Sequence, residues 1–452
     1  MNISSYCIIG IIIPLSFLSF GFSSCLEPPA SPSDQRYYVD SSRMGEPLEI
    51  VWAVPRDTLD FSWYNITPYM FGDNIVFAYD SRLHCVKKST GETVWIAKTE
   101  SSLGTYTPMK CTELLEDGNG GIIHITRDFV QCVSLQNGTT KWRVDNHPSA
   151  AFSFNMDKRS CSETHLFVTY RGRFDNRDKD QGIWAINKSN GSILWKTEIF
   201  PNDTLIDTWS SRPCGTAYHN GRVYFGTREW PGDDGNSYGG TMFCLDALTG
   251  KILWQTRTPG PGPDIQGHQR WDLMKSGVIL GSPVPLDDGS VLAWAGLYLI
   301  KYDPNGKILW RKTVHIDGSV TDGNTTNPHI ENERFYYTNN GSGMAAYMFC
   351  YDMRSDNVLW KQFMTPLGDS QTEGGGFPIQ IDGDRVYKTT DASLLIGFNK
   401  YSGVIEWATN LNMVLPTKRY FERSLFGVRV EGEKVYFITA NHLVCAQRKK
   451  KS

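Results

Sequence analysis

Residues Met242–Thr256 read MFCLDALTGKILWQT and contain the pattern that decides the fold. Apolar residues alternate up to Asp246, and a second short apolar run ends at Trp254. Between the two runs lies Leu248-Thr249-Gly250, a segment typical of a tight turn. Alternation with a period of two on both sides of a glycine-bearing turn predicts a β-hairpin.

The hairpin recurs along the chain, and its tryptophan aligns the copies. Successive tryptophans stand 47, 53, 59, 56, 50 and 47 residues apart, and six of the seven copies have glycine four residues earlier. The exception is Asp356, and aspartate is also tolerated in such turns. The residue ten positions before each tryptophan is mostly small. The residue twelve positions before each tryptophan is apolar or aromatic. The copies end at Trp95, Trp142, Trp195, Trp254, Trp310, Trp360 and Trp407.

A second strand pair precedes most of these hairpins, as at Asn220–Gly226 before the Trp254 copy. Four strands in a repeat of about 50 residues are typical of one blade of a β-propeller. Because a single blade cannot bury both faces of its sheet, the blades are expected to stack around a central axis. The sequence therefore predicts one ring, although its length alone would suggest several domains.

The two ends of the repeat region complete each other. The last copy, Gly432–Gln447, contains a third strand at Leu443–Cys445 and stops before an outer strand. Pro47–Trp52 is an outer strand with nothing before it. Joined, these halves predict an all-β, eight-bladed propeller of four-stranded antiparallel blades over 47–447, closed by strands from both termini. Trp52 then joins the seven other tryptophans as a structural residue that packs between blades.

The segments outside the ring suggest export and a membrane anchor. Residues 1–24 contain an apolar run of signal-peptide length, and Phe22–Cys25 resembles a bacterial lipobox in which Cys25 is lipidated. Residues 25–46 then form a Pro/Ser-rich tether. Ordinary cleavage near Ser24 is the alternative. The basic residues 448–452 are expected to be a solvated tail, with contact to anionic lipid as the alternative.

Charge and cysteine usage narrow the functional classes. A net charge of −3 over 452 residues gives no reason to expect nucleic-acid binding. Five of the ten cysteines occupy the same small position of the repeat, where a buried thiol acts as a small hydrophobe. They are Cys85, Cys132, Cys244, Cys350 and Cys445. Whether Cys111, Cys161 and Cys214 form disulfides stays open. Without a CxxC or HExxH motif, no metal site is expected.

The segment Cys244–Trp254 resembles the tryptophan-docking repeat of the pyrroloquinoline-quinone (PQQ)-like propellers, Ala-x-Asp-x-x-Thr-Gly-x-x-x-Trp, and departs from it at Cys244. The resemblance covers Pro47–Gln447. It implies an eight-bladed ring, but the superfamily holds both quinoprotein dehydrogenases and non-enzymatic lipoproteins of outer-membrane β-barrel assembly. The repeat therefore predicts the fold better than the function.

The residues favour the non-enzymatic branch. The quinoprotein dehydrogenases carry a vicinal Cys-Cys pair, and no Cys-Cys dipeptide occurs here. Asp233, Asp234 and Glu373 lie in glycine-rich loops, where turn formation is the simpler explanation. Asp175–Asp180 resembles a calcium loop without EF-hand spacing. We therefore expect no catalytic residues and no cofactor. The alternatives are a PQQ- and calcium-dependent dehydrogenase, or a small-ligand or glycan binder at the channel mouth.

The long loops predict where binding occurs. Insertions fall between second and third strands, at 171–182 and 228–240, and between blades, at 258–277 and 365–377. In a four-stranded meander both loop classes emerge on one face, and such loops often carry function. The candidate binding residues are Arg171, Arg173, Phe174, Trp230, Asp233, Asp234, Tyr238, His268, Arg270 and Trp271. Packing of Trp230 and Trp271 over blade ends is the alternative.

These expectations combine into one hypothesis: a monomeric propeller lipoprotein of the bacterial cell envelope, anchored through Cys25 at the periplasmic face of the outer membrane. It would bind envelope proteins through the loop side of the ring, in outer-membrane protein assembly.

Overall fold

The computed structural model describes 48–55, 68–79, 82–98, 113–126, 128–145, 150–152, 158–172, 181–199, 212–228, 240–258, 279–295, 298–313, 329–331, 333–339, 347–355, 357–364, 379–389, 394–411, 428–438 and 442–448. The chain divides into two compact units, Met1–Tyr37 and Tyr38–Ser452, and all described residues belong to the second. The predicted signal peptide, Cys25 and the tether lie outside the described residues. Within the described part, no helix is long and apolar enough to cross a membrane.

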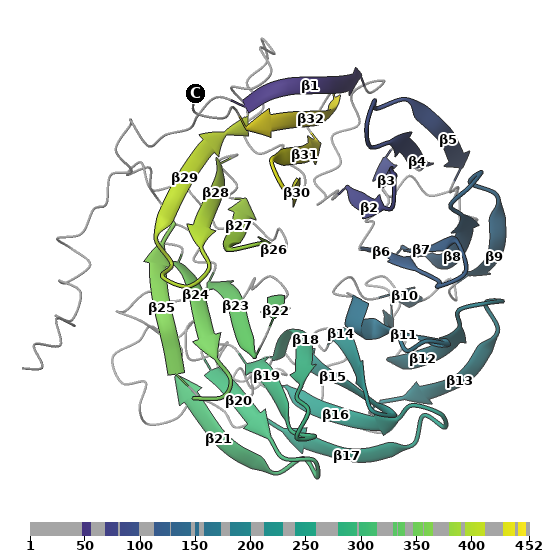
Figure 1. Ribbon diagram of the computed structural model, residues 1–452. Coiled ribbons are helices and arrows are strands. Elements are labelled where there is room, and N and C mark those ends of the chain that lie inside the picture. The colour runs from purple at the N-terminus through teal and green to yellow at the C-terminus, as the bar shows by residue number, and fades with distance from the viewer. Residues whose placement is uncertain are drawn as a thin grey trace, which may run out of the picture. The chain divides into compact units, whose positions relative to one another are not determined.

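The strands form eight four-stranded antiparallel sheets, which are the blades of a propeller (Figure 1). Blade 1 contains β2 (Tyr69–Phe71), β3 (Asn74–Tyr79), β4 (Arg82–Lys87) and β5 (Thr93–Lys98). Blade 2 contains β6 (Glu113–Glu116), β7 (Gly121–Ile125), β8 (Phe129–Ser134) and β9 (Thr140–Asp145). Blade 3 contains β10 (Ala150–Phe152), the 3-10 helix η1 (Lys158–Ser160), β11 (His165–Gly172), β12 (Gly182–Asn187) and β13 (Ile193–Glu198). Blade 4 contains β14 (Arg212–His219), β15 (Arg222–Arg228), β16 (Thr241–Asp246) and β17 (Ile252–Arg257).

The second half of the ring repeats this order. Blade 5 contains β18 (Ile279–Pro285), β19 (Val291–Ala295), β20 (Tyr298–Tyr302) and β21 (Ile308–Thr313). Blade 6 contains β22 (His329–Glu331), β23 (Arg334–Asn339), β24 (Tyr347–Asp352) and β25 (Asn357–Phe363). Blade 7 contains β26 (Gln380–Asp382), β27 (Arg385–Thr389), β28 (Leu394–Asn399) and β29 (Ile405–Asn410). Blade 8 contains β30 (Val428–Glu431), β31 (Lys434–Ile438), β32 (His442–Arg448) and β1 (Leu48–Pro55).

The two ends of the described chain meet in blade 8. The strand β1 pairs antiparallel with β32, with Leu48 opposite Arg448 and Trp52 opposite Cys445. Figure 1 shows β1 lying along the outside of β32. The sequence prediction of an eight-bladed ring closed by strands from both termini is therefore confirmed.

Differences in burial explain why the inner and outer strands have different hydrophobic patterns in the sequence. The inner strands β7 and β16 are buried on both faces, because neighbouring blades cover both sides of each sheet. The outer strand β17 instead alternates between half-buried and exposed residues. Continuous apolar runs thus mark the inner strands, whereas alternation marks the outer ones.

The small residue of the repeat lies opposite the tryptophan. Cys85 pairs with Trp95 and Gly397 with Trp407, and a Cβ added to Gly397 would lie 2.8 Å from Nε1 of that indole. Blade 5 differs, because there Trp310 lies opposite Lys301 and not opposite Ile300. The turn of this hairpin is one residue shorter, because Gly306 follows Asp303 by three residues whereas Gly250 follows Asp246 by four, so Lys301 and not Ile300 occupies the position opposite the tryptophan.

Candidate functional site

The predicted binding residues lie almost entirely outside the described part of the chain. Arg171 is in β11, where its backbone pairs with Ala151 of β10. The other nine, Arg173, Phe174, Trp230, Asp233, Asp234, Tyr238, His268, Arg270 and Trp271, lie outside the described residues. Their loops connect second to third strands or neighbouring blades. The binding role of these residues stays a prediction.

The opposite side of the ring carries the turns between first and second strands and between third and fourth strands, and we call it the tight-turn face. Six of the third-to-fourth turns in the described part of the chain receive the tryptophan of the preceding blade. Trp142 of blade 2 donates its indole N–H to the carbonyl of Lys188 in blade 3 at 2.8 Å. A Cβ at Gly191 would lie 2.7 Å from Cε3 of the same indole. Glycine is therefore needed both for its φ of +75° and for this close approach.

This arrangement, which we call the latch, is present at six of the eight blade interfaces. The tryptophan donors and carbonyl acceptors are Trp52–Lys88, Trp95–Leu135, Trp142–Lys188, Trp195–Ala247, Trp254–Pro304 and Trp360–Lys400. At the other two interfaces, no described residue accepts a hydrogen bond from the indole N–H of Trp310 or from the buried Nε1 of Trp407. The Trp407 interface, between blade 7 and blade 8, is called the seam below.

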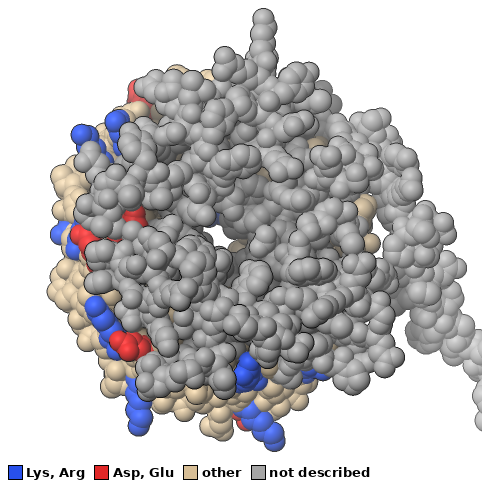
Figure 2. Space-filling view, turned by 180° about the vertical axis from the view of Figure 1, so that it is seen from behind, with Lys and Arg blue, Asp and Glu red and all other residues tan. Residues whose placement is uncertain are grey.

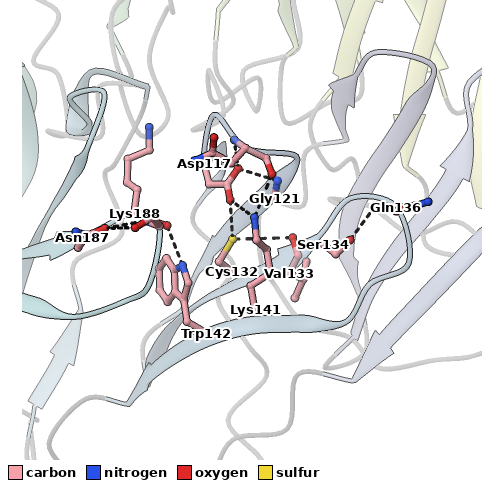
Figure 3. Close-up of polar contacts among 12 residues, drawn as sticks. Asp117, Gly121, Cys132, Val133, Ser134, Gln136, Lys141, Trp142, Asn187 and Lys188 are labelled. Atoms are coloured by element: carbon pink, nitrogen blue, oxygen red, sulfur yellow. Dashed lines mark hydrogen bonds and ion pairs between the residues drawn. The ribbon is translucent and has the colours of Figure 1, made fainter.

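A buried carboxylate organises the tight-turn face of blade 2 (Figure 3). Asp117 is buried and accepts hydrogen bonds from the backbone N–H groups of Asn119 and Gly121 at 2.6 and 2.7 Å. Nζ of Lys141, in the outer strand β9, lies 2.6 Å from Oδ2 of Asp117. The thiol of Cys132 donates a hydrogen bond to the same oxygen at 3.5 Å. The cluster therefore joins the turn before β7 to the outer strand.

The protonation states in this cluster suit a structural role. Burial alone would raise the pKa of Asp117, but Lys141 and the two backbone N–H groups outweigh it and lower the pKa. Hydrogen bonding to Asp117 raises the pKa of Lys141. Burial and the nearby carboxylate raise the pKa of Cys132 to about 12. At neutral pH the cluster is thus a stable ion pair beside an unreactive thiol.

In contrast to this ion pair, a buried histidine and several buried cysteines of the core are held neutral. Burial and the charge of Arg143 lower the pKa of His124 to about 3. Burial raises the pKa of Cys85 and Cys244 to about 12 and that of Cys350 and Cys445 to about 11. These thiols are not nucleophiles at neutral pH. In the described part of the chain, no three His, Cys, Asp or Glu side chains converge as metal ligands.

Among the described residues, two cavities lined mostly by polar amino acids open between blades on the tight-turn face. One of about 500 Å³ lies between blades 1 and 2 and is lined by Asn74, Asn119, Gly120, Ser134, Leu135, Gln136 and Lys141. The other, of about 450 Å³, lies at the seam and is lined by Asp382, Gly383, Asp384, Arg385, Tyr387, Asn399, Glu406, Gly432 and Arg448. In Figure 2, which views the ring from behind, basic and acidic side chains of the described residues are interspersed along the rim.

Sequence reasoning missed a signal that marks both cavities. The residue before the blade tryptophan is apolar and at least 40% exposed in six blades, as at Leu194 and Leu309. In the other two blades it is Lys141 or Glu406. Each of these charged residues forms an ion pair, with Asp117 and Arg385 respectively, and each lines one of the cavities. In the aligned repeat, Lys141 and Glu406 already stand out as charged residues at a position that is otherwise apolar.

Comparisons with known proteins agree with this architecture. The profile of a family described as "Outer membrane protein assembly factor BamB" matches residues 48–199 and 179–265. BamB from Moraxella catarrhalis has 15% sequence identity and a TM-score of 0.54, covering 88% of this chain and 99% of that one. A europium-containing methanol dehydrogenase has 12% identity and a TM-score of 0.57, covering 87% of this chain and 85% of that one.

A sequence match also reaches the enzymatic branch. The dehydrogenase subunit of a quinone-dependent alcohol dehydrogenase from Komagataeibacter europaeus is 26% identical over 130 residues. This match covers 28% of the present chain and spans 16% of that enzyme's length. The chain is a PQQ-like β-propeller protein. Within that class it resembles the assembly factor BamB.

Proposed function

We propose that this protein is a non-enzymatic scaffold of the cell envelope that binds other proteins through the loop side of its ring, in outer-membrane protein assembly. The observation that carries the proposal is the profile match to a family described as an outer-membrane protein assembly factor. The matched residues 48–265 include the loops at 171–182 and 228–240, which carry most of the candidate residues. Aromatic and arginine side chains such as Trp230 and Arg173 are enriched in binding hot spots.

The physical basis of a scaffold role is rigidity. Latches at six interfaces and the β1–β32 pairing join the blades, so that loops can project from a fixed frame. A partner that contacts several loops would then bind without ordering the ring, which keeps the entropic cost of association low.

Site-specific photo-crosslinking in living cells tests this proposal. A photo-reactive residue in place of Trp230 is expected to capture an envelope protein. The same residue in place of Leu248, which is 73% exposed on the tight-turn face of the same blade, serves as the matched control. Capture from both positions, or unchanged porin levels after deletion of the gene, would contradict the assembly role.

The membrane anchor is a separate part of the proposal. Lipid on Cys25 and a tether over 25–46 would hold the ring at the periplasmic face of the outer membrane. Replacing Cys25 by serine is expected to release the protein from the membrane fraction without changing its melting temperature. Retention of the variant in that fraction would contradict the anchor.

A PQQ-dependent dehydrogenase is the second candidate, favoured by the 130-residue match to a quinone-dependent alcohol dehydrogenase. Such an enzyme needs acidic ligands for calcium beside the quinone, and the acids proposed from sequence, Asp233, Asp234 and Glu373, lie outside the described residues. Titration with PQQ and Ca²⁺, followed by cofactor absorbance and dye-linked alcohol oxidation, separates the two functions. A bound, active cofactor would replace the scaffold proposal.

A further inference from the structure

At the interfaces with a latch, a turn of the next blade packs against the tryptophan. At the interface of blades 6 and 7, Trp360 donates its indole N–H to the carbonyl of Lys400 at 3.1 Å. Gly403 of the same turn lies against the indole, where an added Cβ would come within 2.5 Å of Cε3. The surface beside each blade tryptophan is thus shaped to receive a glycine-bearing β-turn and its carbonyl.

The seam offers the same surface without a continuous turn to fill it. The third and fourth strands of blade 8, β32 and β1, come from opposite ends of the chain, so no direct turn connects them. Nε1 of Trp407 is buried there, and no residue in the described part of the chain forms a hydrogen bond with it. A buried, unpaired N–H is costly, so a carbonyl supplied to it would be bound favourably.

Arg448 lies over this surface. Its guanidinium is 5.4 Å from the ring centre of Trp407 and 5.9 Å from that of Tyr387. Nη2 donates to the carbonyl of Gly432 at 2.6 Å, whereas Nε is buried without a partner. No carboxylate among the described residues lies within ion-pair distance of Arg448.

Two of the three cations at the corresponding position of other blades are paired with a carboxylate. Lys400 binds Glu331 of the preceding blade at 2.8 Å, and Lys88 binds Glu431 at 2.9 Å. The matching carboxylate at the seam is Asp382, which instead accepts the backbone N–H of Gly432 at 2.8 Å. Arg448 therefore lacks the carboxylate that Lys88 and Lys400 have, whereas Lys188 at the same position of blade 3 donates to the carbonyl of Ser162.

The remaining acidic groups of the seam cavity are also engaged. Glu406 accepts hydrogen bonds from Arg385 and Asn399, and Asp384 accepts one from Tyr401. The cavity of about 450 Å³ is lined by three carboxylates and two arginines, and Arg448 is the arginine with no carboxylate of the described residues within ion-pair distance. The unpaired Nε of Arg448 is therefore the group of this cavity that favours a carboxylate ligand.

We propose that the seam binds an acidic β-turn of a partner protein. The turn places a backbone carbonyl at Nε1 of Trp407 and a carboxylate at Nε of Arg448, whose side chain moves off the indole as the turn enters. This site lies on the tight-turn face and does not depend on the loop-side binding proposed above.

A cyclic peptide with the sequence of the Lys88–Thr93 turn, KSTGET, is a suitable probe because that turn docks on Trp52 in the ring. Binding to the full-length protein is measured by ¹⁹F NMR after fluorotryptophan labelling, with the Trp407 signal assigned from Trp407→Phe. We expect a Kd on the order of 0.1–1 mM and a shift of the Trp407 signal. Replacing glutamate by glutamine in the peptide is expected to weaken binding about tenfold, a result that needs no protein variant.

Protein variants then locate the site. Arg448→Gln is expected to weaken binding about tenfold with an unchanged melting temperature, whereas Arg354→Gln, an exposed arginine of blade 6, leaves it unchanged. Equal binding of both peptides, no shift of the Trp407 signal, or competition by acetate at the peptide's own concentration would overturn the proposal. A further control replaces Gly45 by valine and Glu46 by glutamine. If the peptide then bound about ten times more tightly, residues 45–46 of the chain itself would be the occupant of the site, and the proposal would be overturned.

Discussion

The interface between blades 2 and 3 and the seam between blades 7 and 8 solve the same packing problem differently. At the first, Trp142 is 7% exposed, its N–H is bonded to Lys188, and Gly191 lies against its ring. At the seam, Trp407 is half-buried under Arg448 and has no acceptor. Hydrogen bonds between side chains of blade 7 and the backbone of blade 8 cross the seam instead. The side chain of Gln380 accepts the N–H of Val430, and the carboxylate of Asp382 accepts the N–H of Gly432. The seam keeps an apolar core, with Leu395 of blade 7 in the same buried cluster as Val435 of blade 8, but in place of the latch it has these polar contacts and a stacked cation.

The largest expected effect concerns the tryptophans themselves. Trp142→Ala is expected to lower the free energy of unfolding by about 3–5 kcal/mol, the usual cost of truncating a buried aromatic residue. Trp310→Ala is expected to cost about 1 kcal/mol less, because no described carbonyl accepts a hydrogen bond from its indole. Urea denaturation measures both values. Equal losses would mean that the indole hydrogen bond contributes little to the latch.

The glycine of the latch gives the next largest effect. Gly191→Ala places a Cβ 2.7 Å from Cε3 of Trp142 and is expected to cost about 2–4 kcal/mol, from left-handed strain and overpacking together. Gly221→Ala is the matched control, because its φ of +76° is nearly the same and nothing lies within 4 Å of an added Cβ. The control is expected to cost about 1–2 kcal/mol. A difference of zero in thermal or urea unfolding would show that the indole moves aside.

The charged residues before the blade tryptophans differ in burial, which predicts different effects. Lys141→Met leaves the buried Asp117 without its cation and is expected to cost about 1–3 kcal/mol. Glu406→Gln breaks a pair whose side chains are 39% and 31% exposed and is expected to cost about 0.5–1 kcal/mol. Urea denaturation at pH 7 measures both.

Acid strengthens this test. The pKa of Asp117 is lowered in the folded protein, so its stabilising effect is present above about pH 4 and is lost as the pH falls through the folded-state value. In Lys141→Met that pKa rises, and acid unfolding is expected to begin at a higher pH than in the unchanged protein. Identical acid midpoints would contradict the role of the Lys141 ion pair.

The smallest effect is expected at the surface ion pairs near the seam. Glu431→Gln removes the 2.9 Å contact with Lys88 across blades 8 and 1, and Glu431 is 50% exposed. A loss of less than about 1 kcal/mol is expected, and it should vanish in 1 M NaCl because exposed pairs are screened. A loss that persists in salt would show that this contact holds the ring as strongly as a latch does.

Most of the fold was predictable because its repeat is local. The spacing of Gly250 and Trp254, copied along the chain, predicts each hairpin, and the incomplete units at Trp52 and Cys445 predict the closure. The shifted register of blade 5 was not predicted, although Ile300 at a small position signalled it.

The polar sites were harder to predict because their partners come from different parts of the blade. Asp117 and Lys141 are brought together by three strands of one sheet, and single-sequence periodicity says nothing of such contacts. The latch acceptors lie 36 to 52 residues beyond their tryptophans, on the neighbouring blade. The aligned repeat contains these positions, but their contact requires the blade-to-blade geometry.

The pairing of Leu48 with Arg448 also constrains the order of events during biogenesis. In vectorial synthesis, β1 emerges before the other strands of the ring, while its partner β32 emerges after them. Until then β1 is an unprotected edge strand bearing the exposed side chains Ile50 and Val51, the kind of segment that associates with foreign strands. The nascent protein is therefore expected to need a chaperone for β1, and release from that chaperone would coincide with the appearance of β32.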